Sequence, residues 1–319
     1  MTTPPSTNAA PKWPHRVALC ASILTWPLVF LGGLVTTYKV GMAVPDWPTT
    51  FGANMLLYDF MNAPPGVQLE HTHRLLGVAV GLACLVLCVV LVWKGPRPAI
   101  KALGVAALIG VSLQGLLGGL RVTRNSQVLA AVHGATGQYF FGLMVAIVVV
   151  TGSVWLGATT PRPDTLRLRR RTLATLGMLL VVVPLGAIVR HFGSHMAIGG
   201  HLLLALMVLG HAIALVVKIE RSKVIVPELV PSSRALGASI LLQFAAGVVA
   251  LVLLWPLDPA RVRFDALQVL VRTFHQANGA LLLGAAIVMT LRAHRAFAPA
   301  AGRLEGIVPT SSRDLEVVA

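Results

Sequence analysis

The sequence predicts an all-α, polytopic membrane protein with eight transmembrane helices. Of its 319 residues, 56% are hydrophobic and only 12% are charged, which is about half the charged share of soluble domains. Eight apolar stretches approach the ~20 residues that cross the hydrocarbon core of a bilayer. These stretches cover residues 17–37, 72–93, 102–120, 128–156, 173–189, 197–217, 235–255 and 267–291.

Basic residues gather in alternate loops between these spans. The two tails and every second loop hold 18 of the 26 Lys and Arg residues, seven lie on the other side, and Arg74 lies inside a span. The positive-inside rule therefore predicts that both termini are cytoplasmic, and the chain is expected in the cell (plasma) membrane. The run RLRRR at 167–171 is interpreted as a contact with membrane lipid. A net charge of +15 alone could suggest a nucleic-acid partner, but the placement of the basic residues in alternate loops predicts none.

Three segments of the first half recur in the same order in the second half. GGLVTTYKVGMAVP at 32–45 matches GAIVRHFGSHMAIG at 186–199, LQGLLGG at 113–119 matches LQFAAGV at 242–248, and HGATGQYFFG at 133–142 matches HQANGALLLG at 275–284. The repeat predicts two tandem four-helix bundles related by internal duplication. The predicted parts are a disordered cytoplasmic tail 1–16, a first half 17–156, a basic cytoplasmic linker 157–172, a second half 173–293 and a cytoplasmic tail 294–319.

Four histidines occupy similar depths in the even-numbered spans, one or two turns from the outer face. They are His73, His133, His201 and His275. An ionisable group inside hydrocarbon costs at least ~2.5–3.5 kcal/mol, so such groups usually face a partner or a functional cavity. One pair in each half suits the axial ligands of heme iron, whereas a zinc site usually gathers three or four ligands. The sequence favours heme over zinc, and His191 and His195 remain alternative ligands.

Glu70, His73 and Arg74 share one face of the second predicted span, because they are three and four residues apart. They indicate either an ordinary helix ion pair or a carboxylate beside a bound macrocycle, with Arg74 placed to meet a propionate. His71 points ~100° away from Glu70 and is a weaker candidate. The Pro- and aromatic-rich loop PDWPTTFG at 45–52 is either an interfacial anchor or a lid over a substrate.

Six segments together are similar to the heme A synthase family. They are GGLVTT and GMAVPDWP within 32–48, EHTHR at 70–74, LQGLLGGLRV at 113–122, AAVHGATGQ around His133 and FHQANG around His275. The resemblance implies an enzyme that oxidises a methyl group of heme O to a formyl group, through a hydroxymethyl intermediate, for cytochrome c oxidase biogenesis. It further implies a heme O synthase upstream and an electron acceptor, and it leaves a homo-oligomer open.

The same resemblance assigns roles to individual residues. Glu70 would be the catalytic acid, His73 and His133 would bind the substrate heme with Arg74 nearby, and His201 and His275 would ligate a heme b cofactor. This chain departs from many relatives in having Leu202 after His201, and the first outer loop lacks a cysteine pair that some relatives have. The first departure leaves His195 and His211 as substitutes for His201.

Two other functions remain open on the sequence. A diheme membrane cytochrome b that transfers electrons without modifying heme would use the same four histidines. A transporter or heme-export channel is suggested by the repeat, but it predicts ionisable residues near the bilayer midplane. Glu70 and the loop at 45–52 favour the enzyme.

Overall fold

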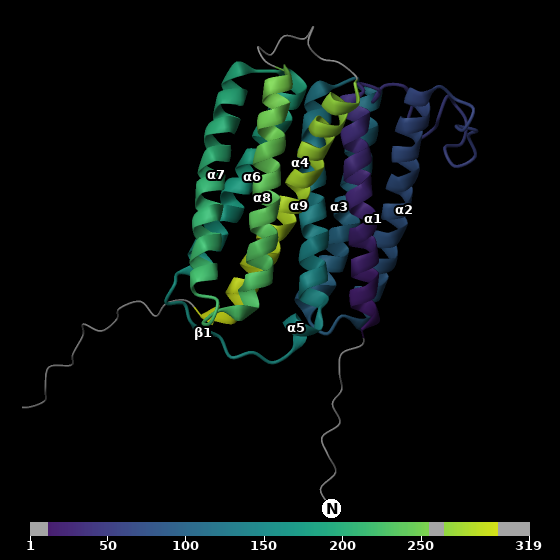
Figure 1. The fold of residues 1–319 in the computed structure, drawn as a ribbon. Helices are drawn as coiled ribbons and strands as arrows, with labels where there is room; N and C mark the ends of the chain where they lie inside the picture. Colours follow the sequence, from purple (N-terminus) through teal and green to yellow (C-terminus); the bar gives the residue numbers. More distant parts are fainter. Residues whose placement is uncertain (1–11, 255–264, 299–319) are drawn as a thin grey trace, which may run out of the picture.

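The structure confirms the all-α membrane architecture. It is a computed structural model that describes residues 12–254 and 265–298, so the predicted tails 1–16 and 294–319 lie mostly outside the described residues. Eight helices are long and apolar enough to cross a membrane (Figure 1). They are α1 (Trp13–Thr37), α2 (Pro65–Lys94), α3 (Pro98–Thr123), α4 (Gln127–Thr151), α6 (Leu168–Phe192), α7 (His195–Arg221), α8 (Val230–Leu254) and α9 (Ala266–Ala296).

Shorter elements lie between and after these helices. The four-residue helix α5 (Ser153–Leu156) follows α4, and a 3-10 turn, η1 (Pro227–Leu229), leads into α8. Two two-residue strands, β1 (Arg162–Pro163) and β2 (Phe297–Ala298), pair in parallel. This pairing fastens the segment before α6 to the end of α9.

The membrane-spanning helices pack in two groups of four. In the first group α1 contacts α2 and α4, and α3 contacts the same two helices; in the second group α6, α7, α8 and α9 contact one another in the same cyclic order. The groups meet where α9 packs against α1 and α4 and where α4 packs against α6. In Figure 1, α2 and α7 accordingly lie at opposite edges, with α4 and α9 between them. Internal duplication remains a prediction.

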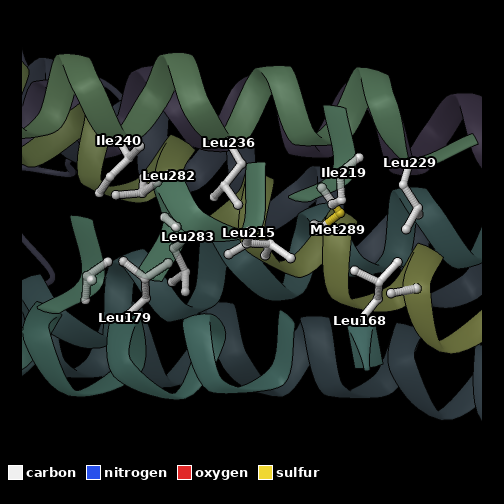
Figure 2. Close-up of a cluster of buried hydrophobic side chains, with 14 of the residues drawn as sticks. Leu168, Leu179, Leu215, Ile219, Leu229, Leu236, Ile240, Leu282, Leu283 and Met289 are labelled. Atoms are coloured by element: carbon white, nitrogen blue, oxygen red, sulfur yellow. The ribbon is translucent and has the colours of Figure 1, made fainter. Parts of the chain in front are cut away.

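Each group encloses an apolar core. In the second group, buried side chains from all four helices form one cluster, and Figure 2 shows Leu236 of α8 pointing toward Leu215 and Leu283. The outer faces are apolar as well. Leu82, Val86 and Val89 of α2 are 59%, 53% and 57% exposed and share one helix face. Such faces are what lipid tails would cover.

Several helix ends differ from the expected spans. Helix α2 begins at Pro65, well before residue 72, and the fixed φ of proline suits the first helical position. Glu70 and His71 therefore lie within the helix and not before it. At α6, Asp164 accepts hydrogen bonds from the backbone N–H groups of Leu168 and Arg169. Most of the run RLRRR at 167–171, which was predicted within the basic linker 157–172, therefore belongs to the first turns of the helix.

One end of the molecule collects the residues singled out by the sequence. Helices α1, α3, α6 and α8 end there, and α2, α4, α7 and α9 begin there. We call it the site end; it is at the top of Figure 1, together with the long connection between α1 and α2. The described chain starts and finishes at the opposite end, as an even number of spans requires.

Candidate functional site

Each of the four predicted histidines lies against a glycine of the preceding membrane-spanning helix. The distance from the ideal Cβ position of the glycine to Cε1 of the histidine is 3.1 Å for Gly32 and His73, 3.4 Å for Gly118 and His133, 3.1 Å for Gly186 and His201, and 2.9 Å for Gly247 and His275. A side chain at Gly32, Gly186 or Gly247 would press on the ring, and one at Gly118 would be in van der Waals contact with it. The four glycines occupy matching positions in the predicted repeat.

His201 of α7 and His275 of α9 face each other in the second group. Their ring centroids are 6.3 Å apart and the ring planes are 76° from parallel. His201 Nδ1 lies 3.2 Å from the carbonyl oxygen of Val182, and His275 Nδ1 lies 3.1 Å from that of Gln243. A carbonyl only accepts, so each Nδ1 carries the proton and each Nε2 is the acceptor nitrogen of its ring. The Nε2 of His275 accepts a hydrogen bond from the side-chain Nε2 of Gln243 at 3.4 Å. Both rings are thereby fixed in the state that a metal ligand requires.

The spacing of this pair fits two ligands of one metal ion. Metal–imidazole bonds of about 2 Å, with each ring centroid about 1 Å beyond its nitrogen, separate the two centroids by roughly 6 Å. Among the described residues, no group of three His, Cys, Asp or Glu is close enough together to hold a metal. The pair thus has the composition of the two axial positions of a heme and lacks the further ligands of a usual zinc site.

The structure brings His201, and neither His195 nor His211, to His275. His195 is exposed at the start of α7. His211 lies ten residues beyond His201 along the helix, and its Nε2 is 3.1 Å from the carbonyl oxygen of Arg171. His191 lies in the last turn of α6, against α4, where its Nε2 is 4.0 Å from the ideal Cβ position of Gly134.

His73 and His133 form the corresponding pair of the first group. They interact electrostatically with each other and with Arg121 of α3. Each Nδ1 is buried without a hydrogen bond of normal geometry, near the main chain of Leu28 in one case and of Gln114 in the other. The structure therefore places both histidines together inside the first group, as the sequence predicts, with less fixed rings than in the second.

Glu70 and Arg74 form a buried ion pair that holds the connection between α1 and α2. Arg74 Nη2 donates to Glu70 Oε1 at 2.9 Å, and the backbone N–H of Val44 donates to Glu70 Oε2 at 2.9 Å. Arg74 also donates to the carbonyl oxygens of Val44, Asp46 and Thr49. Glu70 is 1% exposed. Both terminal nitrogens of Arg74 thus bind the loop, and its contact with a propionate stays a prediction.

His71 and Trp47 complete this attachment. His71 is fully buried, with ring centroids 5.5 Å from Tyr58 and 4.7 Å from Phe60, and its Nδ1 lies 3.3 Å from Thr50 Oγ1. Trp47 lies directly over Gly119 of α3, where any side chain would collide with the indole ring. Residues 44–60, which we call the cap, are therefore packed on α2 and α3. Within the EHTHR motif, Glu70, His71 and Arg74 contact the cap, whereas His73 lies inside the helix bundle.

Asp46 organises the tip of the cap. Its carboxylate accepts hydrogen bonds from the backbone N–H groups of Phe51 and Gly52 and from the hydroxyl of Thr49. Although partial burial acts in the opposite direction, these bonds hold the pKa of Asp46 at about 2, below its ordinary 3.8. The contribution of the carboxylate to cap stability is therefore complete above pH 3.8 and is lost as the pH falls through 2.

Replacing Asp46 by Asn should loosen the cap without affecting the bundle. Charge-assisted hydrogen bonds are roughly twice as strong as neutral ones, so we expect cap amides to exchange about five-fold faster in the variant. Hydrogen exchange followed by mass spectrometry, corrected for intrinsic rates, measures this at pH 7. Between pH 4 and pH 2, the corrected exchange rates of the wild-type cap should approach those of the variant. Asp59→Asn is the matched control, because Asp59 accepts from the Asn62 side chain in the same loop; equal effects of both substitutions would contradict the assignment.

Three arginines near the site end were not singled out by the sequence. Arg121, Arg190 and Arg272 each have a buried side-chain nitrogen without a hydrogen-bond partner. None of the three forms an ion pair with a carboxylate of the described residues. On the sequence they count only as basic residues of the less basic side. The one available signal was their position within or beside predicted spans, in a chain with only 11 acidic residues.

Part of the sequence matches a known protein family. The family model for cytochrome oxidase assembly protein (COX15-CtaA) matches residues 66–200. The chain is similar to this family over that segment, which is less than half of its length. The matched segment includes Glu70, His73 and His133, and it ends one residue before His201. The family match therefore covers the first histidine pair and the root of the cap on α2.

Individual relatives share less than a third of their aligned residues with this chain. A heme A synthase of Rhodopseudomonas palustris (strain HaA2) is 27% identical over 228 residues, covering 58% of this chain and 57% of the relative. That of Exiguobacterium sibiricum is 29% identical over 196 residues, covering 58% of this chain and 63% of the relative. For R. palustris strain BisB18 the identity is 29% over 169 residues, or 46% of this chain and 44% of the relative. The chain thus spans about half the length of the curated relatives that it matches.

Proposed function

We propose that this protein is a heme A synthase, which oxidises a methyl group of heme O to a formyl group through a hydroxymethyl intermediate. The observation that supports this most directly is the pairing of His201 with His275, whose Nδ1 atoms are both fixed by main-chain carbonyls. It occurs in a chain whose relatives are named heme A synthases. The product would serve cytochrome c oxidase biogenesis.

The two histidine pairs take different roles in this proposal. His201 and His275 would hold a heme b, which supplies one-electron transfer when bound. His73 and His133 would bind heme O as the substrate, under the cap. Their Nδ1 atoms lack a normal hydrogen bond, so their rings are held less firmly than those of the second pair. A site that must release its porphyrin needs looser ligands than a site that keeps it.

Glu70 is the acidic residue proposed to act on the substrate. Converting a methyl to a formyl group replaces two hydrogens by one oxygen, and it releases four protons and four electrons when that oxygen comes from water. Glu70 is buried within one turn of His73, where a carboxylate can accept a proton or stabilise developing positive charge. Arg74 holds this carboxylate in place, and the cap above it excludes water.

The cellular setting is also part of the proposal. The basic loops and both termini would face the cytoplasm of the cell membrane, which puts the site end on the outer side. A heme O synthase would supply the substrate, and an external electron acceptor would remove the four electrons. A diheme cytochrome b would instead leave every heme unchanged.

Pigment analysis distinguishes these functions. The chain is expressed in a host that makes heme O but lacks heme A, and the extracted hemes are separated by reversed-phase chromatography and identified by mass. We expect heme A or its hydroxymethyl intermediate. A well-expressed, heme-loaded protein that contains only heme B and leaves heme O unchanged would contradict the synthase and favour the cytochrome.

A further inference from the structure

Arg272 lies beside the second histidine pair, and no described residue gives it a counterion. It precedes His275 by three residues on α9, so both side chains lie on nearly the same helix face, with Arg272 closer to the site end. Its Nη1 is buried without a hydrogen-bond partner. None of the ion pairs between described residues includes it. A guanidinium that no described residue satisfies in this position is placed to bind a further acceptor.

Arg190 of α6 brings a second cation to the same place. Its Nη1 donates to the carbonyl oxygen of Arg272 at 3.2 Å, and its Nη2 donates to the carbonyl oxygen of Gly33 at 2.8 Å and to Thr37 Oγ1 at 2.6 Å. These bonds fix Arg190 between α1, α6 and α9. Its Nε remains buried and unpartnered. The two guanidinium groups repel each other, and Arg190 also acts electrostatically on His275.

The cost of this arrangement indicates an anion. Charged side chains within membrane-spanning helices are expensive and normally pair with an opposite charge. Here two arginines approach each other, and the described residues provide no carboxylate between them. An anionic ligand that accepts hydrogen bonds from Arg272 would remove the repulsion and satisfy the buried nitrogen. Arginine suits this role, since its planar group binds a carboxylate through two parallel bonds.

We propose that Arg272, supported by Arg190, binds a carboxylate of the porphyrin held by His201 and His275. This inference rests on the proposed function, because it requires a heme at that pair. A porphyrin carries its two carboxylates on one edge, and Arg272 lies on the site-end side of His275, where that edge can reach water. A lipid phosphate offers similar chemistry, but Arg190 is bonded to α1 and α9 at the contact between the two helix groups and does not face outward.

The test compares two hemes that differ only at these carboxylates. Heme-free protein, made in a host starved of heme, is titrated in detergent with protoheme and with protoheme dimethyl ester, whose carboxylates are neutral. We expect Arg272→Gln to weaken protoheme binding by roughly thirty-fold or more, as loss of a buried charged partner does, and to leave ester binding within about threefold. Arg272→Lys should restore part of the preference. Arg234→Gln is the control, because Arg234 pairs with Glu220 at the opposite end.

The outcomes separate this inference from the function on which it rests. If wild type binds neither heme, or binds protoheme equally well after His275→Ala, the heme site itself is refuted. If wild type binds the acid and the ester equally, the carboxylate contact is refuted even where Arg272→Gln fails to fold. If Arg272→Gln keeps the acid–ester preference but loses co-purified phosphatidylglycerol, the arginine binds a lipid phosphate and the proposal is overturned.

Discussion

His275→Ala should remove the b-type heme from the purified protein. The substitution deletes one of two facing imidazoles, and His201 alone cannot supply both axial positions. Losing an outer-shell partner of a metal ligand typically costs 10–100-fold in affinity, and losing the ligand itself should cost more. We therefore expect the low-spin signal in the reduced-minus-oxidised spectrum to disappear, with bound heme below one-tenth of the wild-type amount.

Two other histidines serve as controls for this result. His211→Ala removes a ring that bonds to the carbonyl of Arg171, and His195→Ala removes an exposed one. Both variants should keep their heme. An unchanged low-spin spectrum in His275→Ala would refute the second site, whereas heme loss in His195→Ala or His211→Ala would show that one of the alternative ligands is in use.

Glu70→Ala should abolish heme A formation and leave the heme b in place. The substitution leaves Arg74 as an unpaired buried charge, a change that costs about 3–5 kcal/mol, and it removes the acceptor for the Val44 N–H. We expect the cap to open while the second helix group is unaffected. Heme composition after extraction measures the first effect, and hydrogen exchange of residues 44–60 measures the second.

Glu70→Gln separates the two roles of this carboxylate. Glutamine can still accept a hydrogen bond from Val44 or Arg74, so the cap should remain closer to its place while the negative charge is gone. Inactivity with a closed cap would support a chemical role, and activity close to wild type would limit Glu70 to positioning the cap. Glu220→Ala is the matched control, because that carboxylate pairs with Arg234 away from the site end. Loss of heme b in Glu70→Ala would contradict the assignment to the first group.

Hydropathy was sufficient to predict the helices, and residue spacing indicated which histidines lie near one another. All eight spans exist, and His201 meets His275 as the predicted repeat requires. Helix ends were less predictable, because α2 extends beyond its apolar stretch, from a proline that favours a helix start. Charge and hydropathy indicate which residues lie in the membrane, but they do not show that a helix such as α2 continues beyond the membrane into polar sequence.

The partners of Arg74 and Arg190 could not be predicted in the same way. Arg74 binds carbonyl oxygens 25 to 30 residues earlier in the chain, and Arg190 binds Gly33 and Thr37 more than 150 residues earlier. Main-chain acceptors leave no trace in residue type, so no motif reports them. These bonds follow from the packing of the cap on α2 and of α6 against α1 and α9, which only the structure shows.

The construction of the cap imposes an order on biosynthesis. Residues 44–60 leave the ribosome before α2, which supplies Glu70, His71 and Arg74, and before α3, which supplies the surface under Trp47. The segment has nothing to fold against until both later helices are in the bilayer. During synthesis the cap therefore waits as an unfolded loop outside the membrane, and closure of the first site is delayed until the third helix has been inserted.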